Sequence, residues 1–273
     1  MQKYIAEQSG ILIPENKSYI IERRLSRLLE QSGSKSFMNL YLLLQQKNNQ
    51  ALAQKTIDAI TTNETLWFRD STPWSTLEDI LFPRYIREIR EGSRSSVKIW
   101  SAACSTGQEP YSTAMCITRY LHRQGIYDIK LSHFEILATD ICQTALQTAI
   151  SGRYDEISVN RGLEYTYRDR FFKREGRFWL MEEDIRNAVN FKPFNLKDSF
   201  QTLGKFDIVF CRYVTIYFYD ELKRLVLNKI ASALNSGGVL FLGSSELFPD
   251  HCDSYDSLEH KGGIYYRIKE CLT

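Results

Sequence analysis

The spacing of apolar residues changes from a helical to a strand-like pattern near residue 92. Before that point, apolar positions recur at helical spacing over residues 14–31, 37–47, 49–60 and 72–91. Gly33 follows the end of the first helix, and Ser36 is placed to cap the second. Strand patterns begin only after the polar segment GSRSS at 92–96. The sequence therefore predicts an all-α N-terminal domain with a linker helix over residues 1–92 and an α/β domain over residues 93–273.

Within the second domain, short apolar runs alternate with helical stretches. Strands are predicted at 97–100, 134–140, 206–212, 239–242 and 262–268, and helices at 110–123, from about 142, and at 220–234. The run FDIVFCR at 206–212 is almost continuously apolar, as expected of a parallel strand buried on both faces. A late strand pair around a loop at 243–261 is expected to close the sheet. We predict a Rossmann-like sheet with helices on both faces.

The alternation lapses between residues 152 and 192. Residues 177–181 and 188–192 have strand character around the turn REG at 174–176, which predicts a small antiparallel β insertion that faces a partner. Arginines and aromatic residues are frequent here, a mixture that also occurs in nucleic-acid interfaces. Interspersed acidic residues dilute that alternative, and we expect no nucleic-acid partner. They include Glu156, Glu164, Asp169, Glu175, Glu182, Glu183 and Asp184.

Composition and charge narrow the choice of partner, cofactor and cellular compartment. A net charge of +2 over 273 residues gives no general attraction to nucleic acids or membranes. The chain start does not resemble a secretory signal, and no apolar run approaches the ~20 residues of a membrane span. Neither cysteines nor histidines show ligand spacing, so we expect no metal site and a reduced, cytoplasmic protein. The cysteines are Cys104, Cys116, Cys142, Cys211, Cys252 and Cys271, and the histidines are His122, His133, His251 and His260.

The segment VKIWSAACSTGQEPYSTAM, residues 97–115, is the centre of the functional interpretation. A strand, a turn of small residues and a helix N-terminus form the generic nucleotide cradle of an open α/β sheet. The turn has one glycine, Gly107, and Glu109 stands where a phosphate would otherwise lie. A carboxylate there repels a pyrophosphate and attracts a cation, which favours a nucleoside carrying ammonium or sulfonium, as S-adenosylmethionine does. The alternative is a strand–helix unit without a ligand.

Three further features carry candidate chemistry. In TTNETLWFRD, residues 61–70, hydroxyls and an amide precede two aromatic residues and an arginine, which suits a polar ligand pocket or a capping loop. Asp140 ends the second strand, where an acid accepts hydrogen bonds from a ribose or caps the next helix. Arg23, Arg24 and Arg27 share one arc of the first long helix, either as a solvated face or as a docking stripe for an acidic partner.

Six segments together resemble the chemotaxis receptor methyltransferase (CheR) family. In order they are TTNETLWFRD (61–70), IWSAACSTGQEPYS (99–112), ILATDI (136–141), NFKPFNL (190–196), FDIVFCRYVTIYF (206–218) and GGVLFLGSSE (237–246). Each alone is weak, but six in the right order and spacing are specific. The resemblance covers essentially the whole chain and implies a class I methyltransferase fold. It also implies a cytoplasmic enzyme that methylates chemoreceptor glutamates to γ-glutamyl methyl esters, with S-adenosylmethionine as donor and S-adenosylhomocysteine as product.

The resemblance also implies roles for individual residues. Asn63, Thr65, Arg69 and Glu109 would surround the methionine part of the donor, Asp140 the ribose, and Asn195 and Leu196 the adenine. Arg212 and Tyr217 would lie close to the cofactor, with Arg69 and Tyr217 nearest the transferred methyl group as the catalytic pair. Arg23, Arg24 and Arg27 match the place where the family grips its receptor.

The chain departs from the family pattern in two places that matter. The family usually has Asn where this chain has Tyr213. The added bulk weakens donor binding or shifts the donor's pose, or else the phenol supplies a substitute hydrogen-bond donor. The turn KREGR at 173–177 is short beside the Gly-rich loop of members that tether to a receptor C-terminal pentapeptide, so we expect no such tethering. Nothing in the sequence demands more than a monomer. Two alternatives stay open, a donor-binding scaffold with little catalysis and a methyltransferase for another substrate.

Overall fold

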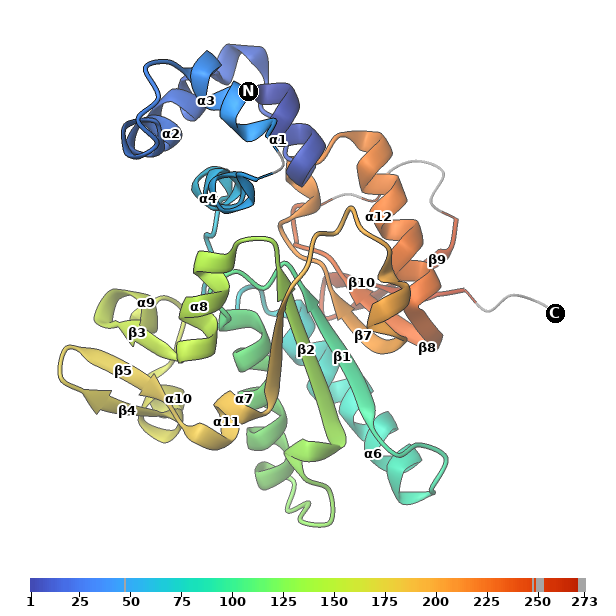
Figure 1. The fold of residues 1–273 in the computed structure, drawn as a ribbon. Helices are drawn as coiled ribbons and strands as arrows, with labels where there is room; N and C mark the ends of the chain where they lie inside the picture. Colours follow the sequence, from blue (N-terminus) through green and yellow to red (C-terminus); the bar gives the residue numbers. More distant parts are fainter. Residues whose placement is uncertain (47, 247, 249–252, 270–273) are drawn as a thin grey trace.

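A seven-stranded mixed sheet forms the body of the computed structural model, which describes residues 1–46, 48–246, 248 and 253–269 (Figure 1). The strand order is β6-β2-β1-β7-β8-β10-β9, and a separate three-stranded sheet has the order β3-β5-β4. The strands are β1 (Val97–Ala102), β2 (Phe134–Asp140), β3 (Arg153–Asp155), β4 (Phe172–Glu175), β5 (Phe178–Met181), β6 (Val189–Pro193), β7 (Phe206–Phe210), β8 (Leu234–Phe241), β9 (Tyr255–His260) and β10 (Gly263–Ile268).

Helices surround this sheet and form a separate layer above it (Figure 1). The α-helices are α1 (Gln2–Ser9), α2 (Tyr19–Gln31), α3 (Phe37–Leu44), α4 (Gln50–Ile60), α5 (Thr72–Thr76), α6 (Phe82–Arg90), α7 (Gln108–Arg123), α8 (Gln143–Ser151), α9 (Glu156–Asn160), α10 (Tyr165–Phe171), α11 (Glu183–Asn187) and α12 (Asp220–Ala233). Short helical turns are η1 (Glu15–Lys17), the π-helical η2 (Leu77–Leu81), η3 (Leu131–His133), η4 (Phe200–Leu203) and η5 (Thr215–Tyr217). No helix in the described part of the chain is long and apolar enough to cross a membrane.

The central strand β1 shows how the sheet is buried on both faces. It pairs in parallel with β2 and with β7, and its side chains alternate between two hydrophobic cores. Val97 and Ile99 belong to one core with α5, α6 and α7, whereas Trp100 and Ala102 belong to the other with α12. The Rossmann-like fold predicted from the apolar runs is confirmed.

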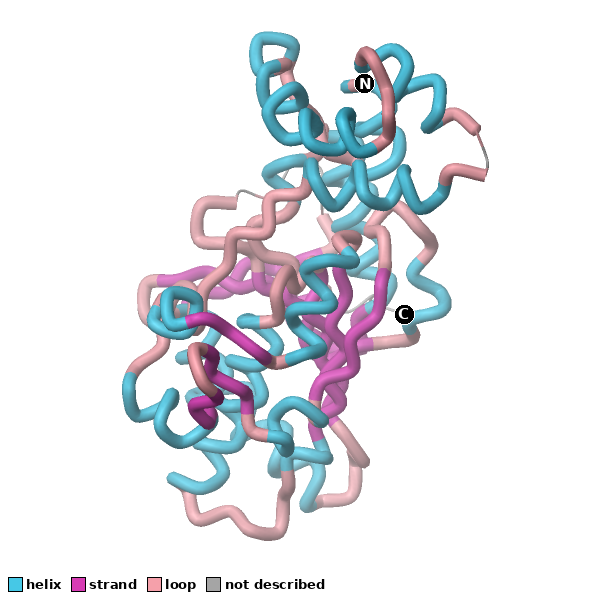
Figure 2. The backbone as a smooth tube through the Cα atoms, turned by 60° about the vertical axis from the view of Figure 1, so that its left-hand side comes forward, coloured by secondary structure: helices cyan, strands magenta, loops and turns pink. Residues whose placement is uncertain are grey.

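The helical layer α1–α4 lies over the carboxyl ends of the parallel strands (Figure 2). Its contacts with the α/β part include two hydrogen bonds: Gln54 donates to the Ile141 carbonyl at 2.9 Å, and the Leu12 amide donates to the Tyr217 carbonyl at 2.8 Å. Carboxyl ends of strands are where open α/β sheets bind their ligands. The helical layer therefore helps to enclose the ligand-binding edge.

Several elements differ from the sequence predictions. Residues 189–193 form β6, which pairs in parallel with β2 at the sheet edge, so the predicted second strand of the antiparallel insertion was wrong. Local alternation marks a strand but does not specify its partner, whereas β3, β4 and β5 do form an antiparallel sheet. Helix α1 was missed, the helix predicted over 72–91 contains a π-helical turn, and β9 lies inside the expected 243–261 loop.

The predicted domain division and part of the predictions about cysteine and histidine remain open. The division at residue 92 stays a prediction; Trp74, Leu81 and Phe82 from α5, η2 and α6 pack in the same core as β1. Four cysteines are free and buried. Cys252, Cys271 and His251 lie outside the described residues.

Candidate functional site

The turn between β1 and α7 has the tight backbone that a ligand cradle needs. Ala103, Ser105 and Gly107 all have positive φ, of 64°, 53° and 92°. A β-carbon on Gly107 would lie 2.8 Å from the Ala149 β-carbon, so this position is restricted to glycine by space as well as by backbone angle. The Cys104 amide donates to the Thr139 carbonyl at 2.9 Å, which ties the turn to the end of β2.

A cavity of about 1020 Å³, which includes some open solvent, lies beside this turn. Its walls come from the segment 60–66, the β1–α7 turn, the end of β2, the segment 194–196, the segment 212–218 and the N-terminal residues Ser9 and Ile11. All ten residues predicted to bind the cofactor or to catalyse line it: Asn63, Thr65, Arg69, Glu109, Asp140, Asn195, Leu196, Arg212, Tyr213 and Tyr217. Residues far apart in sequence therefore converge on one ligand-sized space.

Asp140 marks one end of the cavity, which we call the Asp140 end. Its two carboxylate oxygens accept the Ser105 amide at 2.7 Å and the Cys142 amide at 2.8 Å. Burial raises the pKa of Asp140, and the bonds from Cys142 and Ser105 oppose that rise. The carboxylate thus joins both turns, as a cap does, and keeps lone-pair capacity for a ribose hydroxyl.

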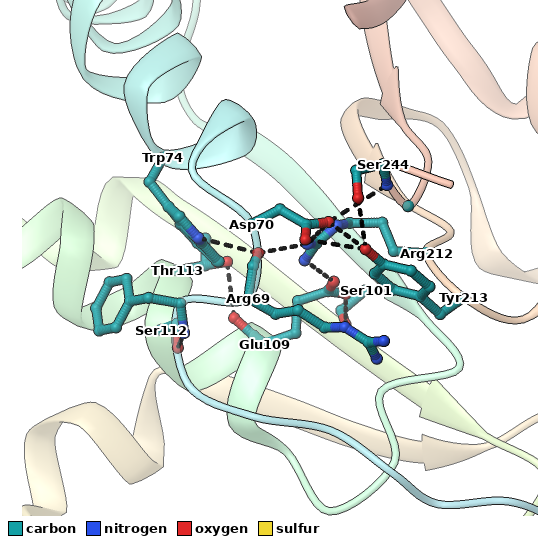
Figure 3. Close-up of polar contacts among 12 residues, drawn as sticks. Arg69, Asp70, Trp74, Ser101, Glu109, Ser112, Thr113, Arg212, Tyr213 and Ser244 are labelled. Carbon is teal, nitrogen blue, oxygen red and sulfur yellow. Dashed lines mark hydrogen bonds and ion pairs between the residues drawn. The ribbon is translucent and has the colours of Figure 1, made fainter. Parts of the chain in front are cut away.

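Asp140 ends β2, on one side of β1, and Arg212 follows β7, on the other side. Charged side chains around Arg212 form a network, which we call the Arg69 end of the cavity (Figure 3). Arg212 pairs with Glu109 at 2.8 Å and with Asp70 at 2.9 Å, and its guanidinium also donates to the Arg69 carbonyl. Ser101 donates to the other Glu109 oxygen at 2.7 Å. Burial raises the pKa of Asp70, but hydrogen bonds from Tyr213 and Arg212 outweigh it and leave that pKa below its usual value. Glu109 and Asp70 thus flank the buried Arg212 guanidinium, and the Glu109 carboxylate lines the cavity as an acceptor for a ligand ammonium.

The backbone around Arg69 is strained. Phe68 and Asp70, on either side of it, have φ of 48° and 57°, and Tyr213 has φ of 58°. Left-handed conformations of residues other than glycine cost roughly 1–3 kcal/mol each and persist where the surroundings fix them. Trp74 donates to the Arg69 carbonyl at 3.3 Å, and the Phe68 amide donates to Ser112 Oγ at 3.1 Å. Arg69 is therefore presented by a segment that its neighbours hold in place.

Glu246 is a site residue that the sequence analysis missed. It is 5% exposed, and its carboxylate accepts the backbone amides of Tyr213 at 2.5 Å, Thr215 at 3.1 Å and Gly243 at 2.8 Å. It also accepts the Thr215 hydroxyl at 2.7 Å. This one side chain fixes the turn that carries Arg212, Tyr213 and Tyr217. A lone acid in GSSE gives no sequence signal of such a role.

Asn195 connects the cavity to the N-terminal helix. Its amide nitrogen donates to the Gln8 carbonyl at 2.7 Å, and its oxygen accepts the Lys197 amide at 3.0 Å. Lys197 Nζ reaches the Ala6 carbonyl at 3.3 Å and also bonds the Glu7 carbonyl. These bonds satisfy carbonyls at the C-terminus of α1 and hold Ser9 against the cavity.

The three arginines of α2 have different surroundings. Arg23 and Arg27 are exposed, and in the described part of the chain neither forms an ion pair. Arg24 is half-buried, donates to Thr61 O at 3.1 Å and to Thr62 Oγ1 at 3.0 Å, and also bonds the Ile60 carbonyl. Arg24 thus caps the C-terminus of α4, while Arg23 and Arg27 stay exposed.

The buried thiols near the cavity are not poised as nucleophiles. Burial raises the pKa of Cys104, Cys142 and Cys211, so each stays protonated at neutral pH. Among the residues that the structure describes, no cluster of three or more His, Cys, Asp or Glu side chains is arranged to hold a metal ion.

The donor set of this cavity fits S-adenosylmethionine. Asp140 offers lone pairs for the ribose, and the Glu109 carboxylate lines the cavity as an acceptor for the ammonium. Bound there, S-adenosylmethionine supplies an electrophilic sulfonium methyl group.

Comparison with known proteins agrees with this donor set. Residues 63–264 match the family model described as CheR methyltransferase, SAM binding domain, and residues 1–61 match CheR methyltransferase, all-alpha domain. The chain is 42% identical over 268 residues to chemotaxis protein methyltransferase Cher2 of Pseudomonas putida, which covers 97% of this chain and 95% of that protein. Chemotaxis protein methyltransferase 1 of Pseudomonas aeruginosa is 41% identical over the same coverage. The Borreliella burgdorferi chemotaxis protein methyltransferase is 34% identical and covers 89% of this chain and 85% of its own length. The chain therefore belongs to the CheR methyltransferase family, as an S-adenosylmethionine-dependent methyltransferase.

Proposed function

We propose that this enzyme transfers a methyl group from S-adenosylmethionine to glutamate side chains in the cytoplasmic helical region of chemoreceptors. The products are γ-glutamyl methyl esters and S-adenosylhomocysteine, and the reaction serves adaptation in chemotaxis-type signalling. The observation that carries the proposal is near-full-length similarity to chemotaxis protein methyltransferases, together with a cavity lined by every cofactor and catalytic residue expected from the family.

The residues of the cavity suit this chemistry. A glutamate carboxylate has an unperturbed pKa of about 4.3, so it is ionised at neutral pH and needs no general base. The enzyme has to orient the carboxylate in line with the methyl group and exclude water, an effect worth up to roughly 7–11 kcal/mol. We assign the orienting hydrogen bonds to Arg69 and to the Tyr217 hydroxyl, since both line the cavity.

A first experiment separates donor binding from catalysis. Isothermal titration with S-adenosylhomocysteine should give micromolar binding, and a purified receptor cytoplasmic fragment should then gain base-labile methyl groups on glutamates. Methylation of other residue types, or of small molecules alone, would contradict the glutamate assignment. Binding without transfer to any acceptor would favour the scaffold alternative.

We further propose that the exposed arginines of α2 dock the acidic face of the receptor. Arg23→Glu with Arg27→Glu should raise the KM for the receptor several-fold and leave donor affinity unchanged, with Arg87→Glu, an exposed arginine on α6, as the matched control. An unchanged KM would show that these residues form a solvated face.

Other aspects of the partner assignment follow from the sequence analysis. We propose a cytoplasmic monomer without a nucleic-acid partner. The short β4–β5 turn around Gly176 supports the absence of pentapeptide tethering. Measurable binding of a receptor C-terminal pentapeptide would overturn that part of the proposal.

A further inference from the structure

Tyr213 contacts both Arg69 and Asp70, and it does so with different parts of its side chain (Figure 3). The Arg69 guanidinium carbon lies 3.4 Å from the centroid of the Tyr213 ring, so the two groups are stacked. The phenol oxygen lies 2.7 and 2.9 Å from the two Asp70 oxygens and 2.9 Å from Ser244 Oγ. Tyr213 therefore holds the strained Arg69–Asp70 segment from one side.

The position of the ring is itself fixed. Gly243 lies against it, and a β-carbon there would be 2.8–2.9 Å from three ring atoms. The Tyr213 backbone is held in its left-handed conformation by Glu246, which accepts its amide. Substituting any larger residue for Gly243 would displace the ring.

The Arg69 guanidinium has little else to hold it. Its contact with the Glu64 carbonyl is long, at 3.4 Å, and the Glu64 carboxylate is engaged by Arg161 at 2.7 Å. In the described part of the chain, no carboxylate forms an ion pair with Arg69. The stacked ring is thus the main constraint on the direction of this side chain.

Stacking differs from ion pairing in what it leaves available. A guanidinium that lies flat on an aromatic ring is attracted by the ring face, while its N–H donors point outward in its own plane. Those donors stay free for a substrate carboxylate, and no competing carboxylate has to be displaced. A carboxylate partner in place of the ring would hold Arg69 equally well but would occupy its donors.

We propose that Tyr213 is a positioning residue for methyl transfer, which stacks on Arg69 and aims its free N–H donors at the substrate carboxylate. This inference rests on the proposed role of Arg69. It gives a function to Tyr213, whose bulk the sequence analysis weighed as an obstacle to the donor: Tyr213 supports the reaction instead.

Variants that separate the ring from the hydroxyl test the proposal. Tyr213→Phe keeps the stacking face but loses the hydroxyl contacts to Asp70 and Ser244, so its kcat with the receptor fragment should fall several-fold less than that of Tyr213→Leu. Tyr213→Leu removes the face, and its kcat should fall about 10-fold or more while S-adenosylhomocysteine affinity changes less than about threefold. Tyr127→Leu, at a tyrosine that is 78% exposed, is the matched control.

A double-mutant cycle distinguishes this inference from the proposed role of Arg69. In an Arg69→Ala background, Tyr213→Leu should change kcat less than about twofold, because Tyr213 acts through Arg69. Equal loss in the Phe and Leu variants, or a full effect of Leu in the Arg69→Ala background, would overturn the inference. If Arg69→Ala alone kept full turnover, the role of Arg69 would fail instead. Tyr213→Met provides the same comparison if the Leu variant does not fold.

Discussion

The two ends of the cavity hold their chemical groups by different means. At the Asp140 end, the carboxylate rests on two backbone amides from turns that follow parallel strands. At the Arg69 end, side chains from the segments 69–70, 109, 212–213 and 243–246 hold one another. Left-handed residues other than glycine occur at both ends, Ala103 and Ser105 at the first and Phe68, Asp70 and Tyr213 at the second. The first arrangement is generic to open α/β sheets, whereas the second depends on this chain's particular residues.

This difference suggests a division of labour. A carboxylate fixed by backbone amides is suited to hold a ligand in one place, because little can move when the ligand binds. A network of side chains that hold one another can pre-orient a reacting group. We therefore expect substitutions at the Asp140 end to change donor affinity and substitutions at the Arg69 end to change turnover.

The largest effect is expected from Arg69→Ala. Loss of the N–H donors that orient the substrate carboxylate should lower kcat about 100-fold or more, while S-adenosylhomocysteine affinity stays within about fivefold. Tyr217→Phe should also lower kcat, by a smaller factor. Steady-state receptor methylation and calorimetric titration measure the two quantities. Equal losses of turnover and affinity would remove the distinction between the two ends.

At the opposite end, Asp140→Asn should mainly weaken donor binding. Hydrogen bonds to a charged group are worth about 1.5–3 kcal/mol, so S-adenosylhomocysteine affinity should fall roughly 10- to 100-fold. If kcat at saturating donor fell as steeply as affinity, the proposed division between donor binding and turnover would be contradicted.

The raised pKa of Asp140 adds a dependence on pH. The folded protein binds this proton more tightly than the unfolded chain does, so ionising Asp140 costs folding free energy as the pH rises through its pKa. Donor binding has the opposite dependence, because only the carboxylate accepts from both ribose hydroxyls. Affinity should therefore decline as the pH falls through this raised pKa, and Asp140→Asn should remove that decline. An identical pH profile in the variant would show that another group is responsible.

The contrast between the ends also explains how far the sequence could predict the site. The end of β2 and the β1–α7 turn have strong local patterns, so Asp140 and Gly107 could be placed from the sequence. Arg69, Arg212 and Tyr217 were identified through the family resemblance, because no local pattern shows that they meet. Glu246 had no signal, since its role depends on amides from two separate turns. The partner of β6 was wrong for the same reason: strand pairing is a long-range property.

Glu246→Gln tests whether the Arg69 end depends on the buried Glu246 carboxylate, which accepts the backbone amides of Tyr213, Thr215 and Gly243. The amide cannot accept on both sides, so at least one backbone amide loses its partner, at a cost of about 1–3 kcal/mol in the free energy of unfolding. The kcat for methyl transfer should fall together with the free energy of unfolding, while S-adenosylhomocysteine affinity should change less. Urea denaturation measures the stability, and Glu259→Gln, at an exposed position on β9, is the control. Unchanged stability would show that the turn at 212–215 holds its conformation without Glu246.

The smallest effect is expected from Asn195→Ala, at the side of the cavity covered by α1. The substitution removes one hydrogen bond to the Gln8 carbonyl, worth about 1 kcal/mol, and loosens the cover formed by Ser9 and Ile11. S-adenosylhomocysteine affinity should fall about two- to fivefold, with kcat unchanged at saturating donor. Asn195→Asp is the informative partner, because it still accepts the Lys197 amide but cannot donate to Gln8. If both variants weaken affinity equally, the bond to Gln8 is responsible, and α1 acts as part of the donor site. If only Asn195→Ala does so, the local turn at Lys197 is what shapes the cavity, and the helical layer contributes to substrate docking rather than to donor binding.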